Sequence, residues 1–216
     1  MKNYFFLSFL ALALLSACSP KPSPTSDDPV EEETITELPM KQLDLSSLPT
    51  QNPGWSEVGS LCYDLQGTAE IQTESGSGLL LSLGAEDGSI SLLNTGIDHQ
   101  DLDLALEFLL SEAGSVELLL QGKYLVDLND SWNNAQTYCG SIAGQAPSVN
   151  AVKAPGLWQQ FSASFHAPDF DEEGNKIADA YLSDVLLNGM PIFNKITLSE
   201  DEASQTGPFQ IRASAN

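Results

Sequence analysis

Residues 181–198 read Tyr-Leu-Ser-Asp-Val-Leu-Leu-Asn-Gly-Met-Pro-Ile-Phe-Asn-Lys-Ile-Thr-Leu, and this stretch decides the fold class. Asn188 and Gly189 separate two runs rich in aliphatic and aromatic residues. Both tolerate the positive φ angles that a type I′ turn requires, so the stretch predicts an antiparallel β-hairpin. Further out, residues 101–108 alternate, with Leu102, Leu104, Leu106 and Phe108 on one face, and this pattern indicates a half-buried strand.

Short strand-like segments separated by turns continue over the rest of the chain. Phe161, Ala163 and Phe165 alternate with polar residues, and residues 116–120 and 124–128 flank a bend expected at Gly122. Nine or ten short strands with turn-rich links and no amphipathic helix favour a single all-β domain over residues 41–216. We expect an antiparallel β-sandwich or jelly roll.

The first 40 residues have a different character. Lys2 precedes a mostly apolar run that is shorter than the ~20 residues of a spanning helix, and the run ends in Leu-Ser-Ala-Cys at Cys18. This boundary resembles that of bacterial lipoproteins, which implies a signal peptide over residues 1–17 and lipidation of Cys18. The alternative is a plain signal peptide with an incidental cysteine. Residues 18–40, acidic and rich in proline, predict a solvated tether.

The resemblance to lipoproteins also implies a cellular location for the protein. A lipidated Cys18 would bind the membrane through its lipid and hold the domain in the bacterial cell envelope. Ser19 rather than aspartate follows the cysteine, which in such lipoproteins fits delivery to the outer membrane.

Charge and composition exclude several functions. The chain has 30 Asp and Glu against 8 Lys and Arg, a net charge of −22, so nucleic acid is not expected as a partner. With two histidines and three cysteines, a metal site built on imidazole or thiolate is nearly excluded. No cofactor is assigned, and a divalent metal stays open as an alternative. Residues 169–174 begin like a calcium loop, but Ala180 stands where the bidentate acid belongs, so we expect an acidic hairpin tip.

The two cysteines left after Cys18 allow two interpretations. In an oxidising envelope compartment Cys62 and Cys139 could form a disulfide. They could equally be two separate buried thiols, because sequence does not show whether their Cα atoms lie within bonding range.

Three blocks carry a resemblance to a known family. They are Gln-Gly-Lys-Tyr-Leu-Val-Asp-Leu-Asn-Asp-Ser-Trp at residues 121–132, Asn-Ala-Val-Lys-Ala-Pro-Gly-Leu-Trp-Gln at 150–159 and Phe-His-Ala-Pro-Asp-Phe-Asp-Glu-Glu-Gly-Asn-Lys at 165–176. Together they resemble the 3-keto-disaccharide hydrolase domain family over about residues 55–212. The resemblance implies a concanavalin-like jelly roll, a carbohydrate substrate and cleavage of glycosides oxidised at sugar carbon 3.

The chain departs from that family in its first block. Lys123 stands in place of an arginine, and Leu125 in place of a glutamate. A non-catalytic glycan-binding lipoprotein on the same fold is therefore the alternative to an enzyme.

Candidate site residues follow from alternation around Gly122. Tyr124, Val126 and Leu128 would point inward, and the polar residues around them would share the outer face. Asp127 or Glu117 is the expected base, with Lys123 as the electrophile; Gln121, Trp132 and Trp158 are expected to bind the sugar. The alternative is an ordinary polar face, with the two tryptophans in the core. His166, on the polar side of its strand, and His99, in an expected turn, are predicted to be exposed rather than catalytic.

Overall fold

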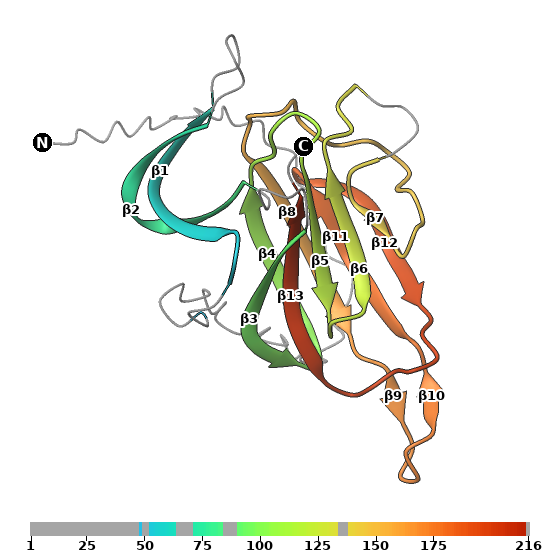
Figure 1. The fold of residues 1–216 in the computed structure, drawn as a ribbon. Helices are drawn as coiled ribbons and strands as arrows, with labels where there is room; N and C mark the ends of the chain where they lie inside the picture. The colour runs from blue at the N-terminus through green and yellow to red at the C-terminus, as the bar shows by residue number, and fades with distance from the viewer. Residues whose placement is uncertain (1–47, 49–51, 64–70, 84–89, 134–137, 215–216) are drawn as a thin grey trace, which may run out of the picture. The chain divides into compact units, whose positions relative to one another are not determined.

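The structure is a computed structural model that describes residues 48, 52–63, 71–83, 90–133 and 138–214 (Figure 1). The predicted signal peptide, the predicted tether and Cys18 lie outside this part of the chain. The strands are β1 (Trp55–Tyr63), β2 (Ile71–Ser82), β3 (Ser91–His99), β4 (Leu102–Phe108), β5 (Ser115–Leu120), β6 (Tyr124–Asn129), β7 (Ser141–Ile142), β8 (Gln159–His166), β9 (Asp169–Phe170), β10 (Lys176–Ala178), β11 (Ala180–Leu187), β12 (Met190–Leu198) and β13 (Gly207–Ser214).

Two larger sheets form the body of the domain. One has the strand order β3-β13-β5-β6-β7 and the other the order β12-β11-β8-β4, and every pairing is antiparallel (Figure 1). Two hairpins, β1–β2 and β9–β10, stand outside these sheets. The described residues contain no helix, and so none that is long and apolar enough to cross a membrane. The predicted all-β antiparallel fold is confirmed.

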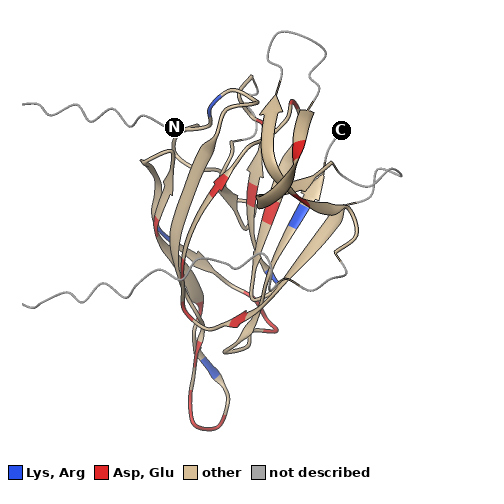
Figure 2. Ribbon diagram, turned by 90° about the vertical axis from the view of Figure 1, so that its left-hand side faces the viewer, with Lys and Arg blue, Asp and Glu red and all other residues tan. Residues whose placement is uncertain are grey.

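Alternating residues from the two sheets share one core. Val126 and Leu118 from the five-stranded sheet are fully buried, and so are Phe161 and Phe165 from the four-stranded sheet. Interdigitation of the two inner faces is the usual way for a sandwich to exclude water from its apolar residues. Figure 2 shows Lys and Arg scattered among more numerous Asp and Glu, with no basic stripe over the described ribbon.

The hairpin that decided the fold class forms as predicted. Asn188 and Gly189 join β11 to β12 with φ angles of 53° and 77°. The Asn188 side chain also donates to the Ala151 carbonyl (2.8 Å) and accepts from the Gln160 amide (3.0 Å). The turn is therefore tied to the start of β8.

The expectation that His99 is exposed is wrong. β3 continues through His99, and its ring packs edge-on against Phe165. Its Nδ1 lies 2.7 Å from the Gln100 carbonyl, and its Nε2 accepts from the Gln121 amide at 3.0 Å. Burial lowers the pKa of the imidazole, so His99 is neutral and part of the scaffold.

The structure also tests the predictions for the acidic loop and for the two cysteines. Residues 171–175 form the tip of the β9–β10 hairpin, where Asp171 accepts from the Asn175 amide. No group of three metal-ligating side chains occurs within the described ranges. Cys62 is exposed and Cys139 is buried, and both are free thiols. The disulfide left open by the sequence is therefore not formed. The alternative of two buried thiols holds for Cys139 and is wrong for Cys62.

Candidate functional site

A row of polar side chains crosses the outer face of the five-stranded sheet. The strand registers align Arg212 of β13 with Glu117 of β5, Glu117 with Asp127 of β6, and Asp127 with Ser141 of β7. We call these four residues the outer row. Side chains of opposed residues lie ~5 Å apart at Cβ, so the row forms one continuous polar strip.

Asp127 is the half-buried acid of the outer row. Its Oδ2 accepts a hydrogen bond from Asn129 Nδ2 at 2.9 Å. Burial raises the pKa of the carboxyl, while the bond from Asn129 acts in the opposite direction. Because desolvation destabilises the ionised form, the Asp127 carboxylate is a stronger base than an aspartate in water.

Glu117 and Arg212 form an ion pair beside this acid. Arg212 Nη2 lies 2.7 Å from Glu117 Oε2, and both side chains are about one-third exposed or less. Sequence reasoning singled out Glu117 but missed Arg212, which is 95 positions away along the chain. No local pattern could have found it, because only the pairing of β13 with β5 brings Arg212 to this face.

The structure corrects two other predicted site residues. Lys123 lies in the turn that joins β5 to β6, and its Nζ donates to the Glu202 backbone carbonyl rather than facing Asp127. Gln121 is only 2 % exposed, and its Nε2 donates to the Gln205 carbonyl at 3.0 Å and to the His99 carbonyl at 3.4 Å. The alternation rule failed because the strand ends at Leu120 and Gln121 begins the turn with a φ of 51°.

The two predicted sugar-stacking residues are both exposed. Trp132, which follows β6, is 52 % exposed, and Trp158, which precedes β8, is 44 % exposed. The alternative that placed them in the core is therefore wrong. Trp158 lines an apolar cleft together with Trp55, whereas Trp132 does not belong to its lining.

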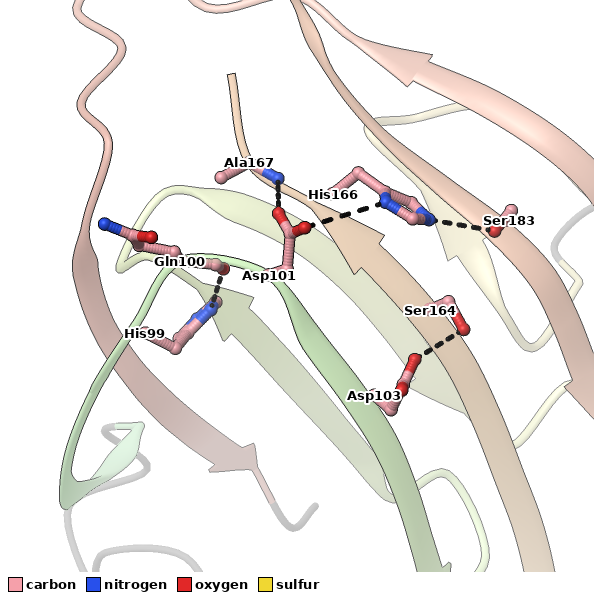
Figure 3. Close-up of polar contacts among 8 residues, drawn as sticks. All are labelled: His99, Gln100, Asp101, Asp103, Ser164, His166, Ala167 and Ser183. Atoms are coloured by element: carbon pink, nitrogen blue, oxygen red, sulfur yellow. Dashed lines mark hydrogen bonds and ion pairs between the residues drawn. The ribbon is translucent and has the colours of Figure 1, made fainter. Parts of the chain in front are cut away.

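A second polar cluster lies on the outer face of the four-stranded sheet, and Figure 3 shows how its members point toward one another. His166 Nδ1 lies 4.0 Å from Asp101 Oδ2, and His166 Nε2 lies 3.3 Å from Ser183 Oγ. The His166 ring stacks on Tyr181 with centroids 4.3 Å apart, and Lys195 Nζ lies 3.7 Å from the Tyr181 centroid. His166 is thus half-exposed and ordered by its neighbours, and it belongs to the sheet opposite the outer row.

Comparisons with known proteins agree with the fold. The family described as "3-keto-alpha-glucoside-1,2-lyase-like domain" matches residues 53–216. Two crystal structures of proteins from Parabacteroides distasonis ATCC 8503, each suggested to be a glycosyl hydrolase, are similar to this chain. The first is 20 % identical with a TM-score of 0.52, over 75 % of this chain and 74 % of that one. The second is 14 % identical with a TM-score of 0.43, over 76 % and 83 %. No protein with a curated description matches.

Proposed function

This chain belongs to the 3-keto-alpha-glucoside-1,2-lyase-like family of carbohydrate-active proteins, and we propose that it cleaves 3-keto-glycosides with Asp127 as the base. A ketone at sugar carbon 3 acidifies the proton on carbon 2. Removal of that proton allows the substituent on carbon 1 to leave, so no strong acid or activated water is needed in the first step.

The proposed reaction is an elimination. Asp127 takes the proton from carbon 2, and the electron pair of the C–H bond passes through the enolate to form a double bond between carbons 1 and 2. The bond from carbon 1 to the leaving oxygen breaks, and that oxygen keeps the pair and takes up a proton. The Arg212 guanidinium, two residues along the outer row, would stabilise the negative charge that develops on the ketone oxygen.

The half-buried Asp127 carboxylate is the observation that carries this proposal. Burial raises its pKa, and general base catalysis gains when the pKa of the base approaches the working pH. Its strand lies within residues 121–132, one of the three blocks that carry the resemblance to the family. Glu117, directly opposite Asp127, is held by Arg212 and is the less available of the two predicted bases.

Substitution of the base tests the proposal. Asp127→Asn keeps the shape of the side chain and should reduce kcat for a 3-keto-glucoside by ~10²-fold or more, the scale of general base catalysis. The matched control is Asp103→Asn, because Asp103 is an exposed acid on the opposite sheet that accepts from Ser164 Oγ (2.7 Å). The kcat of Asp103→Asn should stay within twofold of wild type. Full activity of Asp127→Asn would contradict the assignment of the base.

A glycan-binding protein without turnover is the second candidate. Two observations favour it: Lys123 faces away from Asp127, and Leu125 occupies the outer-face position where the family resemblance has a glutamate. In that case wild type would bind sugars but release no product from any 3-keto-glycoside. Asp127→Asn would then leave the affinity nearly unchanged.

We further propose that the protein is an envelope lipoprotein anchored through Cys18. Support comes from the Leu-Ser-Ala-Cys boundary at the end of the apolar leader. Cys18→Ala should release the protein from the membrane fraction or leave an unprocessed precursor, as shown by fractionation and intact-mass analysis. Processing and detergent partitioning identical to wild type would refute the anchor.

A further inference from the structure

An apolar cleft lies between the β1–β2 hairpin and the end of the sandwich. β1 is held at both ends, because Trp55 Nε1 donates to the Ser91 carbonyl (3.3 Å) and the Tyr63 hydroxyl accepts from the Glu112 amide (3.2 Å). The space enclosed has a volume of about 330 Å³. This falls within the range of ~300–1,000 Å³ that small-molecule sites occupy.

The walls of the cleft are mainly apolar. Two tryptophans and a set of aliphatic residues line it, among them Trp55, Trp158, Leu81, Leu106, Leu110 and Ile211. Glu107 and four serines also line the cleft, but a sugar hydroxyl that faced its aliphatic and aromatic side chains would lose water without gaining a partner, at a cost of ~1–3 kcal/mol for each such group. Aromatic and aliphatic groups carry no such penalty, and aromatic rings also gain from offset or edge contacts with tryptophan.

The cleft adjoins the outer row. Ser115 and Ser214 line it, pair across β5 and β13, and have their hydroxyls 2.7 Å apart. The next residues on the same face of these strands are Glu117 and Arg212 of the outer row. One repeat of two residues along a strand is ~7 Å, so a single sugar ring on the row would reach the rim of the cleft at these serines. The cleft continues on the inner side of the same strands, where Ile211 and Ala213 line it, so the substituent would turn over the strand ends to enter it.

We propose that this cleft binds the aglycone, and that the substrates are 3-keto-glycosides of aryl or other apolar alcohols rather than disaccharides. This inference rests on the proposed function, because the oxidised sugar is placed on the outer row. A phenol is also the better leaving group. Phenolic oxygens have a pKa of ~10, so the oxygen that keeps the electron pair when its bond to carbon 1 breaks is stabilised without a strong acid.

Two substrates separate this inference from its alternatives. They are the 3-keto derivatives of 4-nitrophenyl glucoside and of a glucose disaccharide with the same anomeric configuration. We expect kcat/KM at least tenfold higher for the aryl substrate. Trp158→Ala should reduce that value about tenfold and leave the disaccharide within twofold. Leu157→Ala is the matched control, because Leu157 is an exposed apolar neighbour of Trp158 that does not line the cleft, and it should leave both values within twofold.

A binding measurement keeps the inference independent of turnover. Calorimetric titration of wild type with unoxidised 4-nitrophenyl glucoside should show saturable binding with a negative heat-capacity change. Trp158→Ala should weaken this binding at least fivefold, whereas Leu157→Ala should not change it. If this holds while no 3-keto substrate is cleaved, the proposed function fails and the cleft assignment stands. If both substrates are cleaved equally well, and Trp158→Ala affects neither binding nor rate, the aglycone site is wrong and the proposed function stands. Absence of binding, which is expected if another segment or a second copy fills the cleft, also overturns the aglycone site.

Discussion

Replacement of Gln121 by alanine separates a structural role from a binding role at this position. Its side chain is almost fully buried, and its Nε2 donates to the Gln205 and His99 carbonyls. Each buried hydrogen bond is worth ~1 kcal/mol net, and the one at 3.4 Å is the weaker. Loss of the buried methylene adds ~0.8 kcal/mol, while Oε1 has no partner and its removal offsets part of the cost. The sum is about 2 kcal/mol.

Urea unfolding measures this loss directly. Gln121→Ala should lower the free energy of unfolding by about 2 kcal/mol, which corresponds to ~4–8 °C in Tm for a domain of this size. The control is Gln160→Ala, because Gln160 is exposed and makes one side-chain bond, to Glu107 at 2.9 Å. That variant should lose less than ~0.5 kcal/mol.

The KM of the Gln121→Ala variant tests whether Gln121 contacts the substrate. At a temperature where the variant remains folded, KM for a 3-keto-glucoside should stay within twofold of wild type, because the side chain faces His99 and Gln205 rather than the outer face. Unchanged stability together with a tenfold rise in KM would refute this reasoning. Gln121 would then be the substrate ligand that the sequence predicted.

Two further predictions concern titration and thiol access. Because burial raises the pKa of Asp127, the folded state holds this proton to higher pH than the unfolded chain, and Asp127 lowers stability as pH rises through its raised pKa. Asp127→Asn should therefore raise the urea midpoint at pH 7 relative to wild type, and the difference should shrink at pH 3; a stabilisation that is independent of pH would count against a charge effect. In native protein, iodoacetamide should label Cys62 only, because Cys139 is buried and burial raises its pKa to about 12. Intact-mass analysis of the labelled protein checks this, and a bridged species without free thiols would contradict it.

Local signals predicted the fold well because they act over few residues. Asn188 and Gly189 are next to each other, and the positive φ of both is a property of the residues themselves. The alternation of residues 102–108 likewise needs no knowledge of a partner strand. Both predictions are confirmed, and with them the all-β antiparallel class.

The site was harder to predict because it depends on strand pairing. Arg212 reaches Glu117 only through the register of β13 with β5, which the loops and the whole core determine. Gln121 was misplaced for a related reason: alternation predicts the side of a residue only while the strand continues, and the turn starts one residue before Gly122. Asp127 and Glu117 lie well inside their strands, and their shared outer face was predicted correctly.

The surroundings of the outer row connect the proposed base to the proposed substrate. On one side of the row the outer face carries the opposed pair Leu119 and Leu125, where the family resemblance has a glutamate at the second position. On the other side it carries Asn129, Ser115 and Ser214, which lead to the apolar cleft. The polar residues on this second side can bond sugar hydroxyls, whereas the two leucines add apolar surface beside the Asp127 carboxylate and contribute to its desolvation. Leu125 therefore leaves Asp127 as the only carboxylate on β6, and the polar side of the outer row, next to the cleft, is the side on which the proposed reaction would place the glycoside.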